Sequence, residues 1–418
     1  MNDRDLLASL FKAAVAEADP SNGIRAHLPE APKKGRTVVV GAGKGAAQMT
    51  LALEEIWPQP LSGVVVTRYG YGCKTHNIEV LEAAHPVPDE AGLLAAAEVM
   101  RVVRDLTADD LVIALICGGG SALLPAPPEG FTLADEVAVN ALLLESGAPI
   151  SAMNTIRKHF STIKGGRLAA ATRARVVSLI VSDIPGDNPA FVASGPTIPD
   201  ATTRHDALNL VSQYRMRLPE PLLSHLRSPV ADAPRPDDMI FARNEHHIIA
   251  SAGLSLEAAA RSARDQGFHA VILSDSIEGE ARDVGLVHAA IAREVCLRGR
   301  PFPRPTVILS GGETTVTITT KGGRGGRNGE FALALALAID GYPITALAAD
   351  TDGIDGSQDN AGAFCDGTTV QRLKASGLDG RALLSTHDSY SGFQAIGDLF
   401  VTGPTGTNVN DFRAILVR

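Results

Sequence analysis

The sequence predicts an α/β protein of two domains, and three observations support this prediction. The chain has 418 residues, a length that corresponds to roughly two or three domains of ordinary size. Hydrophobic residues make up 45% of it, enough for a large core, although aromatic residues contribute only 4%. Short apolar runs alternate with amphipathic helical segments along most of the chain. This alternation favours a mostly parallel sheet with helices on both faces, because parallel neighbours need crossover connections.

The first half of the chain opens with an amphipathic helix and then alternates regularly. We expect that first helix at 4–18, with Leu6, Leu7, Leu10 and Phe11 on one face. The strands expected after it are 38–40, 64–67, 111–116 and 176–181, and the helices are 45–56, 90–106, 133–146 and 153–170. The first domain is therefore predicted to be Rossmann-like, with a mostly parallel sheet.

A loop rich in proline and aspartate at 228–238 indicates a domain boundary. We place the first domain at 1–235 and the second, also α/β, at 236–418. In the second domain we expect helices at 256–266, 281–297 and 331–339, and strands at 270–273, 306–309, 314–320 and 344–349.

Charge and cysteine usage narrow the class of protein. The formal net charge is -9, which argues against a nucleic-acid-binding protein, since such proteins neutralise many phosphates. The four cysteines are far apart and form no CxxC pair, as expected for reduced thiols in the cytoplasm. The amino terminus is charged, and no apolar run approaches roughly 18 residues, so we expect neither a signal peptide nor a membrane span.

The first glycine motif follows the strand at 38–40 and reads Gly-Ala-Gly-Lys-Gly at 41–45. A strand, a tight turn and a helix amino terminus form a ready site for an anion, and the cation Lys44 is useful against phosphoryl oxygens. The alternative is a tight turn that needs glycine for geometry alone. The motif is not a Walker A loop. The second strand is followed by Arg68 instead of the acid of a dinucleotide site, which weakens the alternative of a nicotinamide-dependent reductase.

Two further strands of the first domain are followed by residues that could bind a ligand or take part in catalysis. Gly118, Gly119, Gly120 and Ser121 follow the strand at 111–116, and three consecutive glycines suggest the close approach of a ligand. After the strand at 176–181, Asp183 and Asp187 bracket a Pro-Gly pair. These carboxylates could hold Mg²⁺ or accept a hydroxyl proton, and ordinary Asx-turn chemistry is the alternative. Lys158 or Arg157 could pair with a substrate carboxylate. His85 precedes a proline, and we interpret it as structural.

The second domain shows the same design at its strand ends. A Ser-Gly-Gly-Glu turn is expected at 310–313, and Asp350, Asp352 and Asp355 crowd the end of the strand at 344–349. The glutamate that would close an EF-hand loop is missing. The glycine-rich segment 322–329 carries Arg324 and Arg327 before a helix, which suits closure over a phosphoryl group.

Taken together, the motifs resemble the class II glycerate kinases, a family with a MOFRL-type carboxyl-terminal domain whose members have also been named hydroxypyruvate reductases. The resemblance rests on the motifs above and spans nearly the whole chain in order. It also includes His-Pro-Val-Pro-Asp at 85–89, Lys-Gly-Gly-Arg at 164–167, Glu-Gly-Glu-Ala-Arg at 278–282 and Thr-Gly-Pro-Thr-Gly-Thr-Asn at 402–408. Two segments depart from the family pattern. Gly329 stands where glutamine is usual, and Ser357-Gln358 stands where Pro-Thr is usual.

The resemblance implies two α/β domains flanking a cleft and transfer of the ATP γ-phosphoryl group to the 2-hydroxyl of D-glycerate with Mg²⁺. The family's lysine falls on Lys44 and its arginine on Arg327, and we expect Asp183 to join them in catalysis. Asp187 and Asp352 are the predicted metal ligands. We expect nucleotide contacts from Gly41, Gly43, Gly45, Gly118, Gly119, Gly120, Ser121, Gly311, Gly312 and Glu313. The expected partners are glycerate and a nucleotide, without nucleic acid or membrane, and homo-oligomerisation is left open. The alternatives are a hydroxypyruvate reductase and a non-catalytic nucleotide-binding protein.

Overall fold

The computed structural model describes residues 2–318 and 322–418, and its internal contacts group the chain into two compact units. The first unit holds Pro20–Ile249, and the second joins Met1–Asp19 to Ala250–Arg418. This division differs from the predicted one at 235/236, because helix α1 (Asp3–Glu17) packs against helix α11 (Ala252–Asp265). The apolar face predicted for α1 is buried there. An amino-terminal helix is thus built into the carboxyl-terminal unit.

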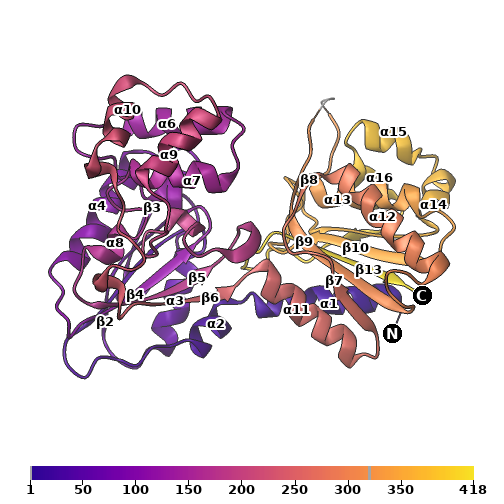
Figure 1. Cartoon of the computed structure of the whole chain (residues 1–418). Helices are drawn as coiled ribbons and strands as arrows, with labels where there is room; N and C mark the ends of the chain where they lie inside the picture. The colour runs from indigo at the N-terminus through magenta and orange to yellow at the C-terminus, as the bar shows by residue number, and fades with distance from the viewer. Residues whose placement is uncertain (1, 319–321) are drawn as a thin grey trace. The chain divides into compact units, whose positions relative to one another are not determined.

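The first unit has a six-stranded sheet in the order β3-β2-β1-β4-β5-β6 (Figure 1). Adjacent strands from β3 through to β5 pair in parallel, which confirms the predicted Rossmann-like sheet. The strands are β1 (Thr37–Ala42), β2 (Leu61–Arg68), β3 (Glu79–Ala83), β4 (Leu111–Cys117), β5 (Arg175–Val181) and β6 (Glu245–Ala250). Their parallel direction brings their carboxyl ends to one edge of the sheet.

Helices connect these strands; some pack on the sheet, and several of those between residues 133 and 227 pack against one another in a separate hydrophobic cluster. The helices are α2 (Pro20–Ala26), α3 (Ala46–Ile56), α4 (Glu90–Arg104), α5 (Gly120–Leu123), α6 (Leu133–Glu145), α7 (Ile150–His159), α8 (Arg167–Ala170), α9 (Arg204–Gln213) and α10 (Glu220–Arg227). The single helix predicted at 153–170 is wrong, since α7 and α8 are separate. Gly165 and Gly166 lie between them with φ of 62° and 82°, a left-handed backbone that a right-handed helix cannot include.

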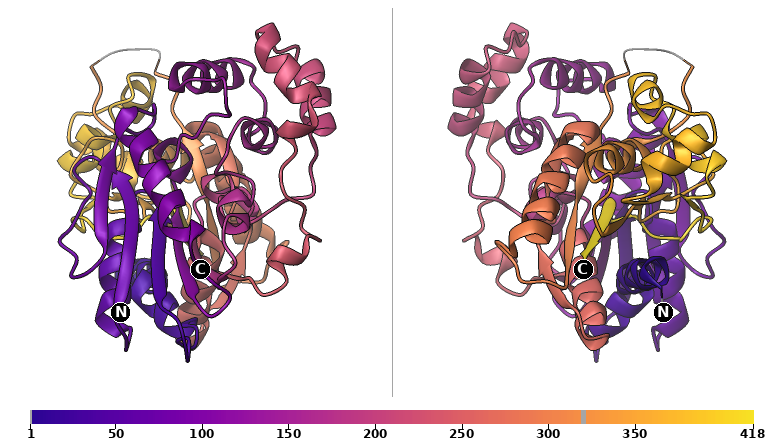
Figure 2. Two further views of the ribbon diagram at one scale, coloured as in Figure 1. Left: turned by 90° about the vertical axis from the view of Figure 1, so that its left-hand side faces the viewer. Right: turned by 90° about the vertical axis from the view of Figure 1, so that its right-hand side faces the viewer.

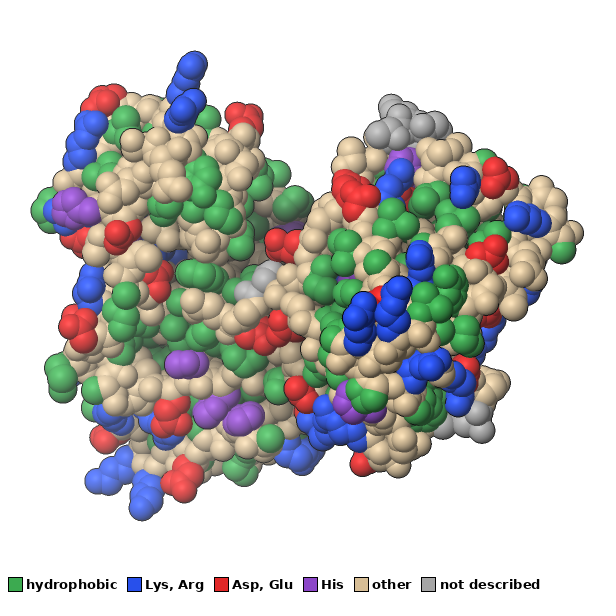
Figure 3. Space-filling view, turned by 45° about the vertical axis from the view of Figure 1, so that its right-hand side comes forward, with side chains coloured by type: hydrophobic (Ala, Val, Ile, Leu, Met, Phe, Trp, Pro, Cys, Tyr) green, Lys and Arg blue, Asp and Glu red, His purple; other side chains and the backbone are tan. Residues whose placement is uncertain are grey.

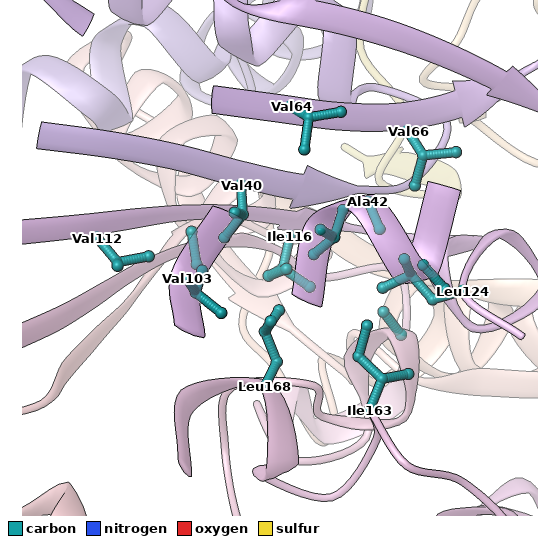
Figure 4. Close-up of a cluster of buried hydrophobic side chains, with 14 of the residues drawn as sticks. Val40, Ala42, Val64, Val66, Val103, Val112, Ile116, Leu124, Ile163 and Leu168 are labelled. Atoms are coloured by element: carbon teal, nitrogen blue, oxygen red, sulfur yellow. The ribbon is translucent and has the colours of Figure 1, made fainter. Parts of the chain in front are cut away.

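The core of the first unit is aliphatic, as the low aromatic content predicts. Val40, Val66 and Ile116, from adjacent strands, belong to one buried cluster with Val103 of α4 and Leu168 of α8 (Figure 4). All of these side chains are almost fully buried. Burial of apolar surface stabilises the unit by about 25 cal/mol per Å², so this core holds the strand ends in fixed positions.

The second unit contains a mixed sheet, ordered β12-β11-β10-β13-β9-β7, with β8 beside β9. The strands are β7 (His269–Ile272), β8 (Ile277–Glu280), β9 (Thr306–Thr315), β10 (Ile344–Asp350), β11 (Gly362–Asp366), β12 (Leu399–Phe400) and β13 (Asp411–Val417). Strands β7 and β8 run parallel to β9, whereas β13 pairs antiparallel with β9 and β10. The strands predicted at 306–309 and 314–320 share one strand, β9, which ends at Thr315, so no strand is present at 316–318; residues 319 and 320 lie outside the described residues.

Helices pack on both faces of this sheet. Besides α1 and α11 they are α12 (Ala281–Arg298), α13 (Arg327–Ala338), α14 (Thr369–Ala375), α15 (Gly380–Ser385) and α16 (Ser389–Ala395). Helices α12 and α13 lie side by side on one face (Figure 2), and α1 and α11 cover the other. Within residues 2–318 and 322–418, none of these helices has the length and apolar character needed to cross a bilayer. Acidic and basic side chains both occur on the face drawn in Figure 3.

Candidate functional site

The turns after β1 and β4 lie against each other at the carboxyl edge of the first sheet. The two strands pair in parallel over their whole length. Beyond the last pair, the Lys44 N–H donates to Gly118 O at 2.8 Å, and the Gly45 N–H donates to Cys117 Sγ at 3.2 Å. The structure therefore brings the first two predicted glycine motifs together.

The backbone N–H groups of the turn after β1 donate hydrogen bonds to other groups of the protein. The Gly43 N–H donates to Val66 O at 3.1 Å, and the N–H groups of Lys44 and Gly45 are donated as described above. We predicted that this turn would lend N–H groups to a phosphate, but those of residues 43–45 are already used. What the turn offers an anion is the Lys44 side chain, which is half-buried. It forms no ion pair with any carboxylate of residues 2–318 and 322–418.

The turn after β4 keeps its donors open. The N–H groups of Gly119, Gly120 and Ser121 have no acceptor among the described residues. Gly119 adopts a φ of 82°, which favours glycine. A Cβ there would lie 3.1 Å from both Lys44 Cγ and His85 Nε2. Consecutive N–H groups in a turn with left-handed backbone form a concave site that suits an anion.

Asp183, after β5, lies against the same turn. A Cβ built on Gly118 would come 1.9 Å from Asp183 Oδ2, so only glycine leaves room for the carboxylate in this position. Burial, together with the nearby charge of Asp183, raises the pKa of the Cys117 thiol to about 12. Cys117 is therefore a protonated, structural thiol. The backbone of Asp187 is unusual: this residue ends the short 3-10 turn Pro185–Asp187 and has a φ of 50°.

His85, which we interpreted as structural, belongs to this cluster. It follows β3, and its ring lies beside Gly119 next to the stem of Lys44. Burial, then the positive charges of Lys44 and Arg68, lower the pKa of His85. The imidazole is thus neutral near pH 7, and it can exchange a hydrogen bond without adding charge. The sequence signal that could have found it was its place directly after a strand.

A hydrogen-bonded chain of side chains leads away from the second turn. Ser121 Oγ lies 2.8 Å from Ser194 Oγ, and Ser194 Oγ donates to Asn154 Oδ1 at 3.1 Å. The same Oδ1 accepts from Arg157 Nη1 at 3.2 Å, while Asn154 Nδ2 donates to Phe191 O at 3.3 Å. The turn after β4 is therefore linked to a guanidinium on α7.

The two cations proposed for a substrate carboxylate differ in this structure. The Lys158 ammonium is buried, pairs with Asp200 and donates to Thr202 O at 2.9 Å, so it is occupied by a structural role. Arg157 Nε donates to Asn140 Oδ1 at 2.8 Å. Its guanidinium makes no ion pair with a carboxylate in the part of the chain that the structure describes.

In the second unit, Arg327 opens helix α13 and is enclosed by acids. Its Nη1 donates to Glu313 at 2.8 Å, its Nη2 to Asp350 at 2.7 Å and its Nε to Asp411 at 2.7 Å. Burial opposes the charge of the guanidinium, but the fields of Asp411, Asp350 and Glu313 outweigh burial and raise the pKa of Arg327. The sequence did not indicate this enclosure, since Asp411 is 84 residues away in the chain.

The amino terminus of α13 already holds an anion of the protein. Asp355 is buried, and its carboxylate accepts from the N–H groups of Asn328 at 2.9 Å and Gly329 at 2.8 Å. A carboxylate is stabilised there by the orphan N–H groups and the helix dipole. Burial nevertheless raises the pKa of Asp355 to about 6. The N–H groups of Asn328 and Gly329 at this helix start are therefore used by the side chain of Asp355.

The glycine pair of the second unit is not a turn. Gly311 and Gly312 lie within β9, opposite Phe412 and Asp411 of β13. Gly312 has a φ of 117°, and a Cβ there would lie 2.2 Å from the backbone of Ile277 in β8. The close approach of β8 explains this glycine, and the turn predicted at 310–313 is wrong, because these residues lie in a strand. Only Glu313 is exposed, and it pairs with Arg327.

The two predicted metal ligands, Asp187 and Asp352, lie on loops that are far apart in the chain. No group of three or more Asp, Glu, His or Cys side chains suited to a metal ion occurs among residues 2–318 and 322–418. Asp187 belongs to the first unit and Asp352 to the second. Asp352 Oδ1 accepts from the Ile354 N–H at 2.8 Å, and its own N–H donates to Asp350 Oδ1. These local bonds are those of an Asx turn.

Comparison with known proteins shows which families and structures this chain resembles. Residues 6–227 match a domain of unknown function, DUF4147, and residues 306–411 match the MOFRL family. A protein of Agrobacterium vitis, provisionally named a hydroxypyruvate reductase, is 51% identical over 99% of this chain and 94% of its own length. A glycerate 2-kinase of Pyrococcus horikoshii is 44% identical over 92% of this chain and 88% of its own length. The crystal structure of a glycerate kinase from Thermotoga maritima has a TM-score of 0.90 and 37% identity, with 99% of both chains covered.

The match therefore extends over nearly the whole length in sequence and in structure. The first of these three relatives is named as a reductase and the other two as kinases. The three proteins are therefore similar to this chain although their names differ. On the combined DUF4147 and MOFRL matches and these identities, the chain belongs to the class II glycerate kinase family.

Proposed function

We propose that this protein transfers the γ-phosphoryl group of ATP to the 2-hydroxyl of D-glycerate, giving 2-phosphoglycerate and ADP. The observation that carries the proposal is the cluster at the carboxyl edge of the first sheet. There, a lysine without an acidic partner, an open glycine turn and a carboxylate lie together. The names of relatives that are 34–44% identical over most of their length favour the same reaction.

Lys44 supplies positive charge to the phosphoryl oxygens in this proposal. Phosphoryl transfer spreads negative charge over those oxygens, so preorganised cations and N–H donors stabilise the transition state. Its ammonium needs no release from a protein carboxylate before it can act. The open N–H groups of Gly119 and Gly120 would bind the phosphates from the neighbouring turn.

Asp183 accepts the proton of the reacting alcohol. The alcohol oxygen forms a new bond to the γ-phosphorus, the bond from that phosphorus to the bridging oxygen breaks, and ADP leaves with the electron pair. The proton that the alcohol loses passes to the Asp183 carboxylate. Asp183 suits this step because Gly118 leaves space directly against it. Neutral His85 would accept or donate one hydrogen bond nearby.

Arg327 is proposed to join the reaction only after an exchange of partners. Its guanidinium contacts Glu313, Asp350 and Asp411, so a phosphate would have to compete with these acids. Action of Lys44 and Arg327 on one phosphoryl group remains a prediction. Non-additive loss of kcat in the double variant would support it.

Mg²⁺ is proposed to arrive with the nucleotide. Because the described residues form no ready set of three ligands, one or two carboxylates together with phosphate oxygens would hold it, as is usual for this ion. Asp187 and Asp352 remain the proposed contributors. A cytoplasmic setting also stays part of the proposal, and it is supported by the free state of all four cysteines.

The test is incubation of the purified full-length protein with ATP, Mg²⁺ and D-glycerate, followed by ³¹P NMR of the product. We expect 2-phosphoglycerate and ADP in equal amounts. A parallel assay with NADH or NADPH and hydroxypyruvate, without ATP, examines the reductase that one group of relatives is named for. Cofactor oxidation in that assay, with no phosphoglycerate in the first, would overturn the kinase proposal.

A further inference from the structure

The hydrogen-bonded chain that ends at Ser121 has a fixed direction. Asn154 Nδ2 faces the carbonyl of Phe191, which can only accept, and Oδ1 faces Arg157, which can only donate. The amide orientation is thus set from both sides. Ser194 must therefore donate its proton to Oδ1. The remaining contact is satisfied only if the hydroxyl of Ser121 donates to Ser194.

The consequence is that Ser121 Oγ presents lone pairs, not a proton, to its open side. Ser194 is the hydrogen-bond partner of Ser121 Oγ among the described residues, and Ser121 is half-buried. A phosphate oxygen is also an acceptor, so it would be a poor partner for this atom. A hydroxyl group of a ligand can donate to it without disturbing the chain.

The backbone around Ser194 is held in an unusual conformation that fixes this arrangement. Ala193 and Ser194 have φ of 52° and 60°, a left-handed backbone that is unfavourable for residues other than glycine. The segment persists because Gly165 N–H donates to Ser194 O at 3.1 Å, and because Ala193 packs against Gly120 of the open turn. Strain of this kind, next to a ligand-binding turn, is typical of a positioned functional group.

We infer that Ser121 Oγ accepts a hydrogen bond from the substrate hydroxyl that is not phosphorylated, and so selects which hydroxyl reacts. This inference rests on the proposed function. If Asp183 takes the proton of the 2-hydroxyl, Ser121 receives the hydrogen bond of the 3-hydroxyl. Ser121 then contributes specificity for a dihydroxy acid rather than nucleotide affinity, which corrects our assignment of this residue to the nucleotide. Ser194, Asn154 and Arg157 are positioning residues.

The experiment compares Ser121→Ala with the wild type on D-glycerate and on D-lactate, which lacks the 3-hydroxyl. A site that hydrogen-bonds a hydroxyl discriminates against the analogue without it, so we expect kcat/KM for D-glycerate to fall roughly 10- to 100-fold. The value for D-lactate and the Kd of ADP should stay within about 2-fold, because neither uses this bond. Ser121→Thr, which keeps the hydroxyl, should restore most of the preference. Ser224→Ala, on the exposed face of α10, is the matched control.

Equal losses on both acids, or weaker ADP binding in Ser121→Ala, would overturn the inference and leave the kinase intact. If the wild-type protein phosphorylates neither acid, the proposed function itself fails, and the two failures are thereby distinguished. Circular dichroism and thermal melting of each variant show whether it is folded.

Discussion

Lys44 and Arg327 are the two cations that we predicted to act on the phosphoryl group, and the structure treats them in opposite ways. Lys44 lies on a turn whose backbone donors are all used, yet its ammonium pairs with no carboxylate of the described chain. Arg327 is held by Glu313, Asp350 and Asp411. One cation is available to a ligand, and the other also holds the second unit together.

The difference shows that a basic residue in a glycine-rich segment can have either of two roles, binding a ligand or neutralising carboxylates of the protein. Lys44 is half-buried and forms no ion pair with a carboxylate of the described residues, so its ammonium is available to an anionic ligand. A buried guanidinium among carboxylates compensates their charge, and its removal leaves those charges exposed to each other. Loss of stability and loss of activity can therefore separate the two roles.

The largest expected effect is on stability, from Arg327→Met. Removing one partner from a buried ionic cluster typically costs about 3–5 kcal/mol, because the remaining charges lose their compensation. We expect the free energy of unfolding in urea to fall by that order. As a control, Arg324→Met should change it little, since Arg324 is exposed and its guanidinium contacts Gln358 and the ring of Tyr390. An unchanged unfolding curve for Arg327→Met would show that the enclosure is not structural.

Lys44→Met is expected to affect activity with little change in stability. Loss of a preorganised charge at a transition state typically lowers kcat by about 100- to 1000-fold. The thermal midpoint should stay close to that of the wild type, because Lys44 makes no ion pair that folding depends on. Lys34→Met, at an exposed position of the same unit, is the matched control. Wild-type turnover in Lys44→Met would remove this residue from the mechanism.

The acidic environment of Arg327 also predicts a pH dependence. Burial raises the pKa of Asp355 to about 6 from its ordinary value of 3.8, so the folded protein holds this proton more tightly than the unfolded chain does. Between pH values of about 4 and 6, the contribution of Asp355 to the unfolding free energy falls as the pH rises, by up to about 3 kcal/mol. Urea unfolding at several pH values, compared with Asp355→Asn, measures this slope. An identical pH profile in the variant would contradict the raised pKa.

The smallest effect that we predict compares the two glycine turns of the first unit. In Gly118→Ala the new Cβ would meet Asp183 Oδ2 at 1.9 Å, so the carboxylate must move, at a cost of about 1–3 kcal/mol. We expect kcat to fall roughly 10-fold as the base shifts. Gly45→Ala is the control, because its nearest neighbour, Cys117 Sγ, lies 3.7 Å away. Equal activities in the two variants would mean that Asp183 is not placed by Gly118.

Much of the first unit could be predicted from the sequence, and its success has a local cause. Strands such as 111–116 are continuous apolar runs, and each is followed by glycine or aspartate. The residues next to each strand therefore indicate where it ends and which ends share one edge of the sheet. The prediction failed at 153–170, where the turn at Gly165 and Gly166 interrupts a helical pattern. Their role becomes visible only through their contacts with 194–195.

The second unit was predicted less well because its contacts are distant. The Ser-Gly-Gly-Glu segment at 310–313 looked like a turn, but the pairing of Gly312 with Asp411 keeps it in a strand. The predicted domain limits differ from the two compact units for the same reason. Helix α1 packs against α11, which is more than half of the sequence away. The local sequence around these residues indicates neither contact.

The sequence by itself determined the α/β class, the positions of the strand ends and the residues that could carry charge to a phosphate. Periodicity, glycine and charge act over a few residues, and one chain displays them directly. Only the tertiary structure decided which charges are neutralised and which donors stay open. It enclosed Arg327 with acids, left Lys44 unpaired, and turned the hydroxyl of Ser121 into an acceptor through Ser194 and Asn154. These outcomes depend on distances between residues far apart in the chain, and electrostatic and hydrogen-bond energies vary steeply with distance.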